Sequence, residues 1–416
     1  MKQNIFEILK FRPYLFFVVS TLFSNIGTGM QVIANSWLIL DISGQVSSIA
    51  IFLMCYTLPG IFLSPLTGII VDKIDRRWLA ISMDIYRGLI LLTIFVLWHL
   101  GSLLTWHLYL MGILIAIGDQ IYSPAAAAMI REVVKKDMLL SANASTSIAM
   151  QVGALIGAGF AGLIIAVSSA IDIMWINALS FVVSSFLLNF VRKGYKSPST
   201  NISKVKGYKK YFSQLTDGIR YIVDNTSIIP MYILIFCITA TVRTINVLLA
   251  PFAKDVLAVG SVGFGYIDAS FALGAILGGL LLPNIYNKFN FNKTVVLLMG
   301  MLSCGLIGFS LSNKLIIAML FFFLIGASVN VKIVCLTLVQ QIVSLDYQGR
   351  VHSTFNAIFS VLTFGLYFLM GYLGDLISLR WLYSFQGIIV IVVVILVLNS
   401  KSVCVKAVKN EKKLPV

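Results

Sequence analysis

The stretch Gly68–Arg77, which reads GIIVDKIDRR, carries five charged residues in its last six positions. Apolar runs flank it on both sides, FLMCYTLPGIFLSPLT before it and WLAISMDIYRGLILLTIFVLW after it. Only 11% of the chain is charged and 59% is hydrophobic, whereas soluble domains contain about 25% charged residues. A short charged segment between two apolar segments of this length is typical of a loop that joins two membrane-spanning helices.

The whole chain follows the same pattern, with a mean hydropathy of +0.96. Segments in lipid must satisfy their own backbone hydrogen bonds, so we expect an all-α membrane protein. Hydropathy predicts twelve transmembrane helices, at about residues 13–39, 49–70, 78–99, 106–130, 139–167, 172–191, 226–252, 262–284, 294–312, 315–342, 352–374 and 380–399.

A polar, basic segment divides these spans into two sets of six. We therefore predict an N-terminal six-helix bundle at 1–191, a cytoplasmic basic linker at 192–225, a C-terminal six-helix bundle at 226–399 and a cytoplasmic basic tail at 400–416. The spans occupy most of the 416 residues, which leaves no room for a large extramembrane enzyme or receptor domain.

The distribution of Lys and Arg predicts the orientation. With the N-terminus in the cytoplasm, 25 of the 31 basic residues lie in cytoplasmic segments and three lie outside. This asymmetry predicts that both termini are cytoplasmic. It also accounts for the net charge of +15, because anionic lipids of the inner leaflet attract basic loops. We therefore expect the basic loops to interact with membrane lipids and not with a nucleic acid.

The charged hinge resembles the loop 2–3 motif of the major facilitator superfamily, G-x-x-x-D-R/K-x-G-R-R, with Asp75 in place of the usual glycine. Residues 122–164 resemble the span 4–5 region of the drug/siderophore exporter branch, which includes macrolide efflux and enterobactin exporters. Residues 338–359 resemble the turn between spans 10 and 11 of that branch. The resemblance implies the major facilitator fold, two six-helix bundles with alternating access, in a bacterial inner or plasma membrane.

Two departures from the superfamily pattern affect these expectations. In the second copy of the hinge, Gly279 is present but Pro283 stands where Asp72 stands in the first copy, which predicts a one-sided acidic latch. In span five, Gly153–Gly162 is similar to the antiporter motif but has Ala158 in place of proline, so we expect no kink. Close helix packing is an equally simple explanation for these small residues.

The resemblance implies a gating function for the hinge, and the charges suggest how it works. We assign gating to Gly68, Asp72, Lys73, Arg76, Arg77, Asp84 and Arg87. Asp72 has three possible partners: Arg76, Arg87, or the N-terminus of a helix in the other half. Asp84 and Arg87 are three residues apart and are expected to form a structural ion pair on one helix face.

Charges within spans are costly in lipid and usually face a cavity or a partner. Asp119 is the candidate for proton coupling; the alternative is a buried pair with Arg243 or Lys332. Asp268 lies in span eight near the expected outer surface. Arg243 and Lys332 are substrate-binding candidates, because two cations suit a substrate with carboxylates. Gln31 and Asn35 are further candidates, although interhelical hydrogen bonds explain such residues equally well.

Several motifs are missing from the sequence. There is no P-loop, no catalytic Ser/His/Asp arrangement, and the three histidines do not form a metal cluster. We therefore expect neither an enzyme nor a cofactor or metal site, and we expect a monomer. The predicted function is proton-coupled export of a small organic molecule, first a siderophore-like anionic metabolite. The alternatives are macrolide or multidrug efflux, a lipid flippase, and a sensor that does not transport.

Overall fold

The structure is a computed structural model that describes residues 8–135, 138–191 and 207–399. The chain forms two compact units. Unit 1 comprises Met1–Lys210 with Gly260–Gly265, and unit 2 comprises Tyr211–Val259 with Tyr266–Val416. All regular elements in the described ranges are helical, as expected for apolar segments that must pair their own backbone groups in lipid.

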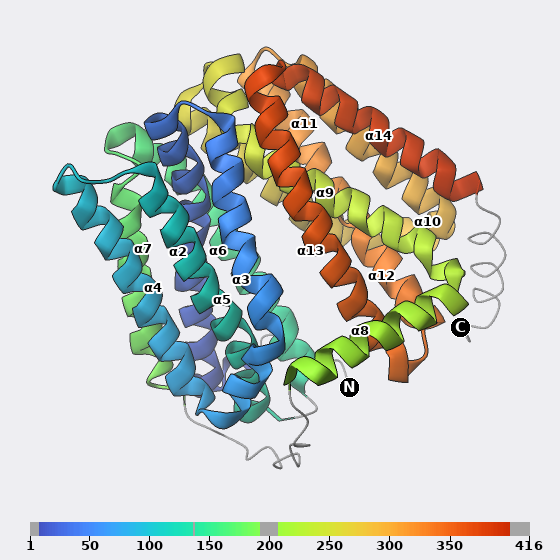
Figure 1. Ribbon diagram of the computed structural model, residues 1–416, viewed down its shortest axis with the longest axis horizontal. Coiled ribbons are helices and arrows are strands. Elements are labelled where there is room, and N and C mark those ends of the chain that lie inside the picture. The colour runs from blue at the N-terminus through green and yellow to red at the C-terminus, as the bar shows by residue number, and fades with distance from the viewer. Residues whose placement is uncertain (1–7, 136–137, 192–206, 400–416) are drawn as a thin grey trace. The chain divides into compact units, whose positions relative to one another are not determined.

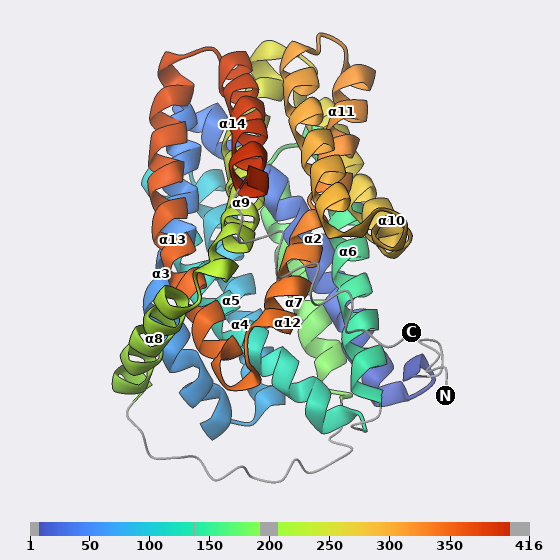
Figure 2. The same cartoon turned by 90° about the vertical axis from the view of Figure 1, so that its right-hand side faces the viewer.

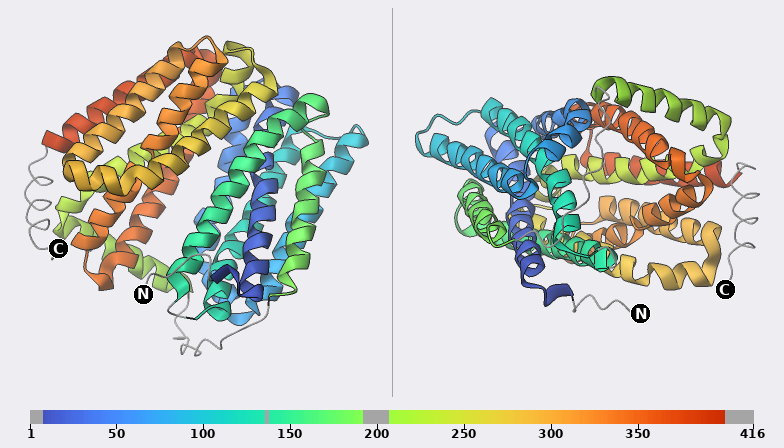
Figure 3. Two further views of the ribbon diagram at one scale, coloured as in Figure 1. Left: turned by 180° about the vertical axis from the view of Figure 1, so that it is seen from behind. Right: turned by 90° about the horizontal axis from the view of Figure 1, so that it is seen from below.

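Unit 1 is a bundle of six long helices that run alongside one another (Figures 1 and 3). They are α2 (Arg12–Ser43), α3 (Val46–Lys73), α4 (Arg76–His99), α5 (Thr105–Val133), α6 (Leu139–Val167) and α7 (Asp172–Leu188). Helix α2 packs against α6 and α7, and α4 packs against α5 and α7, while α3 packs against α5. The short connections are those of an antiparallel bundle.

Helices α2 and α6 pack closely because glycines line their contact. A Cβ added at Gly157 would lie 2.3 Å from the backbone oxygen of Ile26, and one at Gly153 would lie 2.8 Å from that of Leu22. In contrast, a Cβ at Gly159 would meet no atom within 4 Å. The small residues of span five therefore serve helix packing. Helix α6 is one uninterrupted helix, as the absence of proline predicts.

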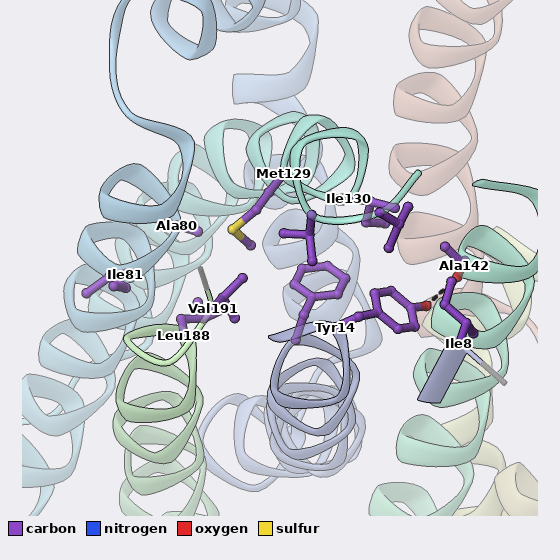
Figure 4. Close-up of a cluster of buried hydrophobic side chains, with 12 residues drawn as sticks. Ile8, Tyr14, Ala80, Ile81, Met129, Ile130, Ala142, Leu188 and Val191 are labelled. Carbon is purple, nitrogen blue, oxygen red and sulfur yellow. Dashed lines mark hydrogen bonds between the residues drawn. The ribbon is translucent and has the colours of Figure 1, made fainter. Parts of the chain in front are cut away.

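A cluster of buried side chains fills one end of unit 1, the end at which α3 and α4 are joined. Figure 4 shows this cluster, which draws on α2, α4, α5, α6 and α7. At its centre, the hydroxyl of Tyr14 donates to the backbone oxygen of Ala142, at 2.6 Å, and lies within hydrogen-bond distance of Ser145 and Thr146. The buried hydroxyl is thus satisfied, and it ties α2 to α6.

Unit 2 contains the remaining spans, apart from the first residues of α10 at Gly260–Gly265, which belong to unit 1. Its elements are η2 (Thr226–Ile228), α9 (Ile229–Pro251), the π-helical turn η3 (Phe252–Val256), α10 (Gly260–Leu311), α11 (Leu315–Ser328), α12 (Val331–Ile342), α13 (Leu345–Leu376) and α14 (Leu379–Asn399). Helix α10 holds two predicted spans, and α11 with α12 forms one. Counted this way, the described residues contain all twelve predicted spans, six in each half of the chain.

The helices of unit 2 are interrupted at two places that the hydropathy of the sequence did not predict. The loop expected between spans eight and nine is helical except for Asn290, whose φ of 59° breaks α10. The predicted span 315–342 is broken between α11 and α12, where the Asn330 side-chain amide donates to the backbone oxygens of Ala275 and Ala327 at 3.0 and 3.1 Å. The asparagine thereby satisfies carbonyls near the break.

Sequence analysis assigned no helix to the basic segment at 192–225, yet it contains α8 (Gly207–Asp224). Figures 1 and 2 show α8 at the end of α13. Asp217 of α8 pairs with Arg350 of α13 at 3.1 Å. Tyr221 stacks on Tyr347 with ring centroids 4.8 Å apart. These contacts fasten α8 to the beginning of α13.

Candidate functional site

The turn between α3 and α4 is held by Asp75, the residue that departs from the superfamily motif. Its Oδ1 accepts hydrogen bonds from the backbone N–H groups of Arg77, at 3.0 Å, and Trp78, at 3.3 Å. Asp75 is therefore the N-cap of α4, where an aspartate is among the most favourable residues. The replacement of glycine at this position strengthens the start of the helix.

The two arginines that follow make contacts within unit 1. Arg76 forms a salt bridge with Glu132 near the end of α5. The guanidinium of Arg77 donates to the backbone oxygens of Asn189 and Val191, both at 3.3 Å, just beyond α7. Cations that bind the last carbonyls of a helix also interact favourably with its dipole. The hinge thus fastens the ends of α4, α5 and α7 together.

Three other gating candidates lie outside the described side chains. These are Gly68, Asp72 and Lys73, whose backbone belongs to α3. The proposed latch through Asp72, and the gating assignment for the hinge as a whole, therefore stay predictions.

A group of charged residues that we name the charge cluster lies inside unit 1. It consists of Asp84 and Arg87 on α4 and Asp119 on α5. Arg87 forms salt bridges with both acids: its Nη2 binds Asp84 Oδ1, and its Nη1 binds Asp119 Oδ1 at 2.6 Å. The exposed fraction of the side chains is 0% for Asp84, 5% for Arg87 and 29% for Asp119. Of the two acids, only Asp119 is therefore accessible to a substantial degree.

The second oxygen of each acid is also bound. Oδ2 of Asp119 accepts a hydrogen bond from Tyr56 of α3, at 2.5 Å. Oδ2 of Asp84 accepts one from Ser184 of α7, at 2.6 Å, and Ser184 in turn lies 2.8 Å from Ser20 of α2. The network of the charge cluster therefore joins five of the six helices of unit 1, namely α2, α3, α4, α5 and α7, and every member named here has a partner.

The guanidinium of Arg87 lies between two aromatic rings. Its carbon is 4.4 Å from the ring centroid of Tyr122 and 4.3 Å from that of Phe181. A Cβ added at Gly118 would lie 2.8 Å from Cγ of Arg87. Cation–π contacts and the missing side chain at Gly118 therefore fix the position of the arginine between its two acids.

The charge cluster confirms one sequence expectation and revises another. Asp84 and Arg87 form the predicted ion pair. For Asp119 we had considered Arg243 or Lys332 as a partner, but its salt bridge is to Arg87. The cluster has two acids and one base, so it carries one excess negative charge unless it binds a proton. A proton-coupling role for Asp119 stays a prediction.

The cations of unit 2 have a different environment. Arg243 of α9, Lys332 of α12 and His352 of α13 all have exposed side chains. The charges of Arg243 and Lys332 are close enough to repel each other, and Lys332 is close to His352. Among the described residues none of the three pairs with an acid, and Asp268 of α10 forms no ion pair with them.

The polar candidates of the first span are buried in unit 1. The Gln31 side chain accepts a hydrogen bond of 2.5 Å from the side-chain amide of Asn177 on α7. Asn35 is 7% exposed, and its Oδ1 has no hydrogen-bond partner among the described residues. The bond of Gln31 favours an interhelical role for that residue, while substrate binding by either residue stays a prediction.

The comparison with protein families agrees with this architecture. The model of the transmembrane secretion effector family, MFS_3, matches residues 6–415. The chain belongs to this family of major facilitator superfamily transporters. It is thus a multi-pass membrane transporter that carries small-molecule substrates, and not an enzyme.

Named relatives of this transporter include exporters. It is 22% identical to macrolide efflux protein A of Streptococcus pyogenes, over 81% of this chain and 83% of the relative. It is 24% identical to the multidrug efflux pump Tap of Mycolicibacterium fortuitum, but that match spans only 50% of this chain and 52% of Tap.

Solved structures show the same fold as this transporter. The nucleoside transporter NupG superposes with a TM-score of 0.72 and 12% identity, covering 93% of this chain and 98% of NupG. A bacterial homologue of the iron transporter ferroportin gives a TM-score of 0.71 with 17% identity, over 93% and 98% of the two chains. The predicted major facilitator fold is therefore confirmed.

Sequence analysis missed several partners in the site. Tyr56, Ser184 and His352 gave no signal by motif or spacing, because each becomes important only through packing against a distant helix. The acid Glu132 could have been flagged, since it lies in a segment otherwise rich in bases at the end of span four.

Proposed function

We propose that this transporter exports small amphiphilic organic molecules, of the drug or macrolide kind, in exchange for protons. Support for this cargo comes from the relatives named as macrolide and multidrug exporters, both at low identity. They favour this alternative over the siderophore-like metabolite that we ranked first from the sequence. Alternating access would come from rocking of the two six-helix bundles, with both termini in the cytoplasm.

The observation that supports proton exchange is the charge cluster. Its most exposed residue, Asp119, is the proposed site of proton binding. Both oxygens of Asp119 accept hydrogen bonds, from Arg87 and Tyr56. This is the arrangement of a carboxylate. When Asp119 binds a proton, its attraction to Arg87 weakens and Arg87 is left with Asp84 as a neutral buried pair. When the proton leaves, the excess charge needs contact with water, which the 29% exposure of Asp119 supplies.

The need of the deprotonated cluster for water couples protonation of Asp119 to the conformation of the transporter. A state that shields Asp119 from water favours the protonated cluster, and a state that exposes it permits release. One proton that moves down a membrane potential of about 100 mV supplies about 2.3 kcal/mol. For an uncharged cargo exchanged one for one, that free energy supports a concentration ratio of about 50. In this proposal Asp72, just before the turn that Arg76 and Arg77 hold in place, would stabilise the outward-open state by closing the cytoplasmic side.

A deletion strain tests the choice of cargo. The strain and its complemented control are scored in parallel for sensitivity to erythromycin and ethidium and for secreted siderophore. Increased drug sensitivity with normal siderophore secretion is the expected result. Reduced siderophore secretion with unchanged drug sensitivity would overturn the drug assignment in favour of the anionic metabolite.

Vesicle flux separates transport of soluble cargo from the other functions. Everted membrane vesicles that contain the transporter should accumulate ethidium when a proton gradient is imposed, and should lose it when the gradient is collapsed. Movement of a fluorescent phospholipid between leaflets without dye accumulation would instead indicate a lipid flippase. Absence of both fluxes would favour a sensor.

A further inference from the structure

The exposed cations Arg243, Lys332 and His352 lie on three helices of unit 2 that are neighbours. Helix α9 packs against both α12 and α13. Tyr232 of α9 stacks on Phe355 of α13 with centroids 3.4 Å apart, and Phe236 approaches Phe359 at 5.0 Å. Both pairs differ by 123 positions, so α9 and α13 run parallel in a constant register.

This register brings Arg243 to the level of Tyr367. Arg243 follows Tyr232 by eleven residues, which is close to three helical turns, so it continues the face that meets α13. Adding the register offset to Arg243 gives position 366, one residue from Tyr367, and the guanidinium does interact with the Tyr367 hydroxyl. At the other end of the aromatic pairs, His352 precedes Phe355 by three residues and shares its face.

Lys332 lies on α12, the third helix of this group. Helices α12 and α13 are joined by the two residues 343 and 344, and Gln348 donates to the backbone oxygen of Gln340 at 2.7 Å. They are therefore antiparallel neighbours, and α12 also runs opposite to α9. Side chains lean toward the N-terminus of their own helix, so Arg243 and Lys332 extend toward each other.

The exposed cations must contact either lipid or water, and the free energies of the two contacts differ. Each lies within a membrane-spanning helix, where contact of a charged side chain with lipid costs about 2.5–3.5 kcal/mol. Among the described residues no acid neutralises them, although they repel each other. Contact with water lowers the cost of these charges, and a bound anion would offset their repulsion.

We propose that Arg243 and Lys332 form an anion-binding subsite that receives the carboxylate of an amphiphilic cargo. Arg243 binds the carboxylate with two parallel N–H donors, and Lys332 adds a second positive charge. His352 lies near Lys332, on the side away from Arg243, and does not contact the carboxylate. Tyr367 positions the guanidinium. The half-buried rings of Phe236 and Phe359 offer apolar surface beside the subsite. The inference rests on the proposed export function and adds amphiphilic organic acids as a second cargo class beside the cationic drugs.

Binding to the purified full-length chain in lipid nanodiscs tests the subsite without transport. The probes are salicylate and its uncharged amide, salicylamide, with inorganic phosphate as a third probe, all at constant ionic strength. The wild-type chain should show a higher melting temperature with salicylate than with salicylamide. Arg243→Gln and Lys332→Gln should each weaken salicylate binding about tenfold or more, because each removes a charge-assisted hydrogen bond. Arg243→Lys should lie between.

Lys293→Gln is the matched control, since it removes an exposed positive charge of unit 2 away from the subsite. It should bind salicylate as the wild type does. Equal losses in Lys293→Gln and Arg243→Gln would overturn the proposal, as would a wild type that does not distinguish salicylate from salicylamide. Stabilisation by phosphate and not by salicylate would overturn the carboxylate assignment.

Transport of matched dyes separates failure of the subsite from failure of the proposed function. In everted vesicles, Arg243→Gln should reduce transport of carboxyfluorescein about tenfold and leave ethidium transport within about twofold of wild type. Salicylate binding without transport of either dye would retain the subsite and refute export. Ethidium transport with no salicylate binding would retain export and refute the subsite.

Discussion

Removal of Arg87 is expected to destabilise unit 1 strongly. In the variant Arg87→Gln, Asp84 loses its cation while its side chain stays 0% exposed. The carboxyl must then bind a proton or remain charged in a dry site. Protonation at pH 7 of a group whose ordinary pKa is about 3.9 costs about 4 kcal/mol, which agrees with the roughly 3–5 kcal/mol lost when a buried pair is broken.

This free energy sets the size of the expected effect. A helical unit of about 200 residues loses about 2–4 °C in melting temperature for each kcal/mol. At pH 7, Arg87→Gln should therefore melt about 8–16 °C below the wild type. At pH 5 the proton costs only about 1.5 kcal/mol, so the difference should shrink to about 3–6 °C. The measurement is thermal unfolding of the full-length protein in detergent, followed by a thiol-reactive dye.

Two further variants make the result specific. Asp84→Asn with Arg87→Gln removes both charges and should recover most of the stability at pH 7. Arg131→Gln, which removes an exposed arginine of α5, should melt within about 2 °C of the wild type. The reasoning is refuted if Arg87→Gln loses the same amount at pH 5 and pH 7, or if the double variant is no more stable than Arg87→Gln.

Three other expectations concern the same unit. Asp119→Asn keeps an acceptor for Tyr56 but cannot release a proton. Vesicles with this variant should lose gradient-driven dye accumulation and retain passive exchange. Dye accumulation equal to that of the control variant Asp255→Asn would contradict a proton role for Asp119. Asp75→Ala should cost about 1 kcal/mol through loss of the helix cap, whereas Asp75→Gly should cost only a few tenths, and equal melting temperatures for the two would argue against the capping role. Gly157→Ala should cost about 1–3 kcal/mol by forcing α2 and α6 apart, while Gly159→Ala should be neutral; equal melting shifts for the two would refute the packing argument.

The positions of the spans could be predicted because lipid leaves few alternatives. A helix that crosses a bilayer needs about 20 apolar residues, and hydropathy reports that length directly. The pair of Asp84 and Arg87 was predictable for a similar reason, since i,i+3 spacing on a helix determines the contact. The partner of Asp119 was not predictable, because Arg87 lies 32 residues away on another helix and only bundle packing brings the two together.

Helix α8 escaped prediction for a different physical reason. Its mean composition is polar, and a hydropathy window averages its two faces. Only the apolar residues at helical spacing, such as Tyr221 with Tyr347 as its partner, reveal a surface that packs on α13. The break at Asn330 is likewise invisible to a hydropathy average, since a single polar residue in an apolar run changes it little.

The attachment of α8 to α13 determines where the gene could be divided. A split transporter, made as two polypeptides that assemble in the membrane, would lose α8 from its proper half if the cut followed residue 225. Asp217 would then be covalently part of one fragment while Arg350 belonged to the other. A cut before residue 207 keeps these partners on one polypeptide, so co-expressed halves divided there should reassemble more readily.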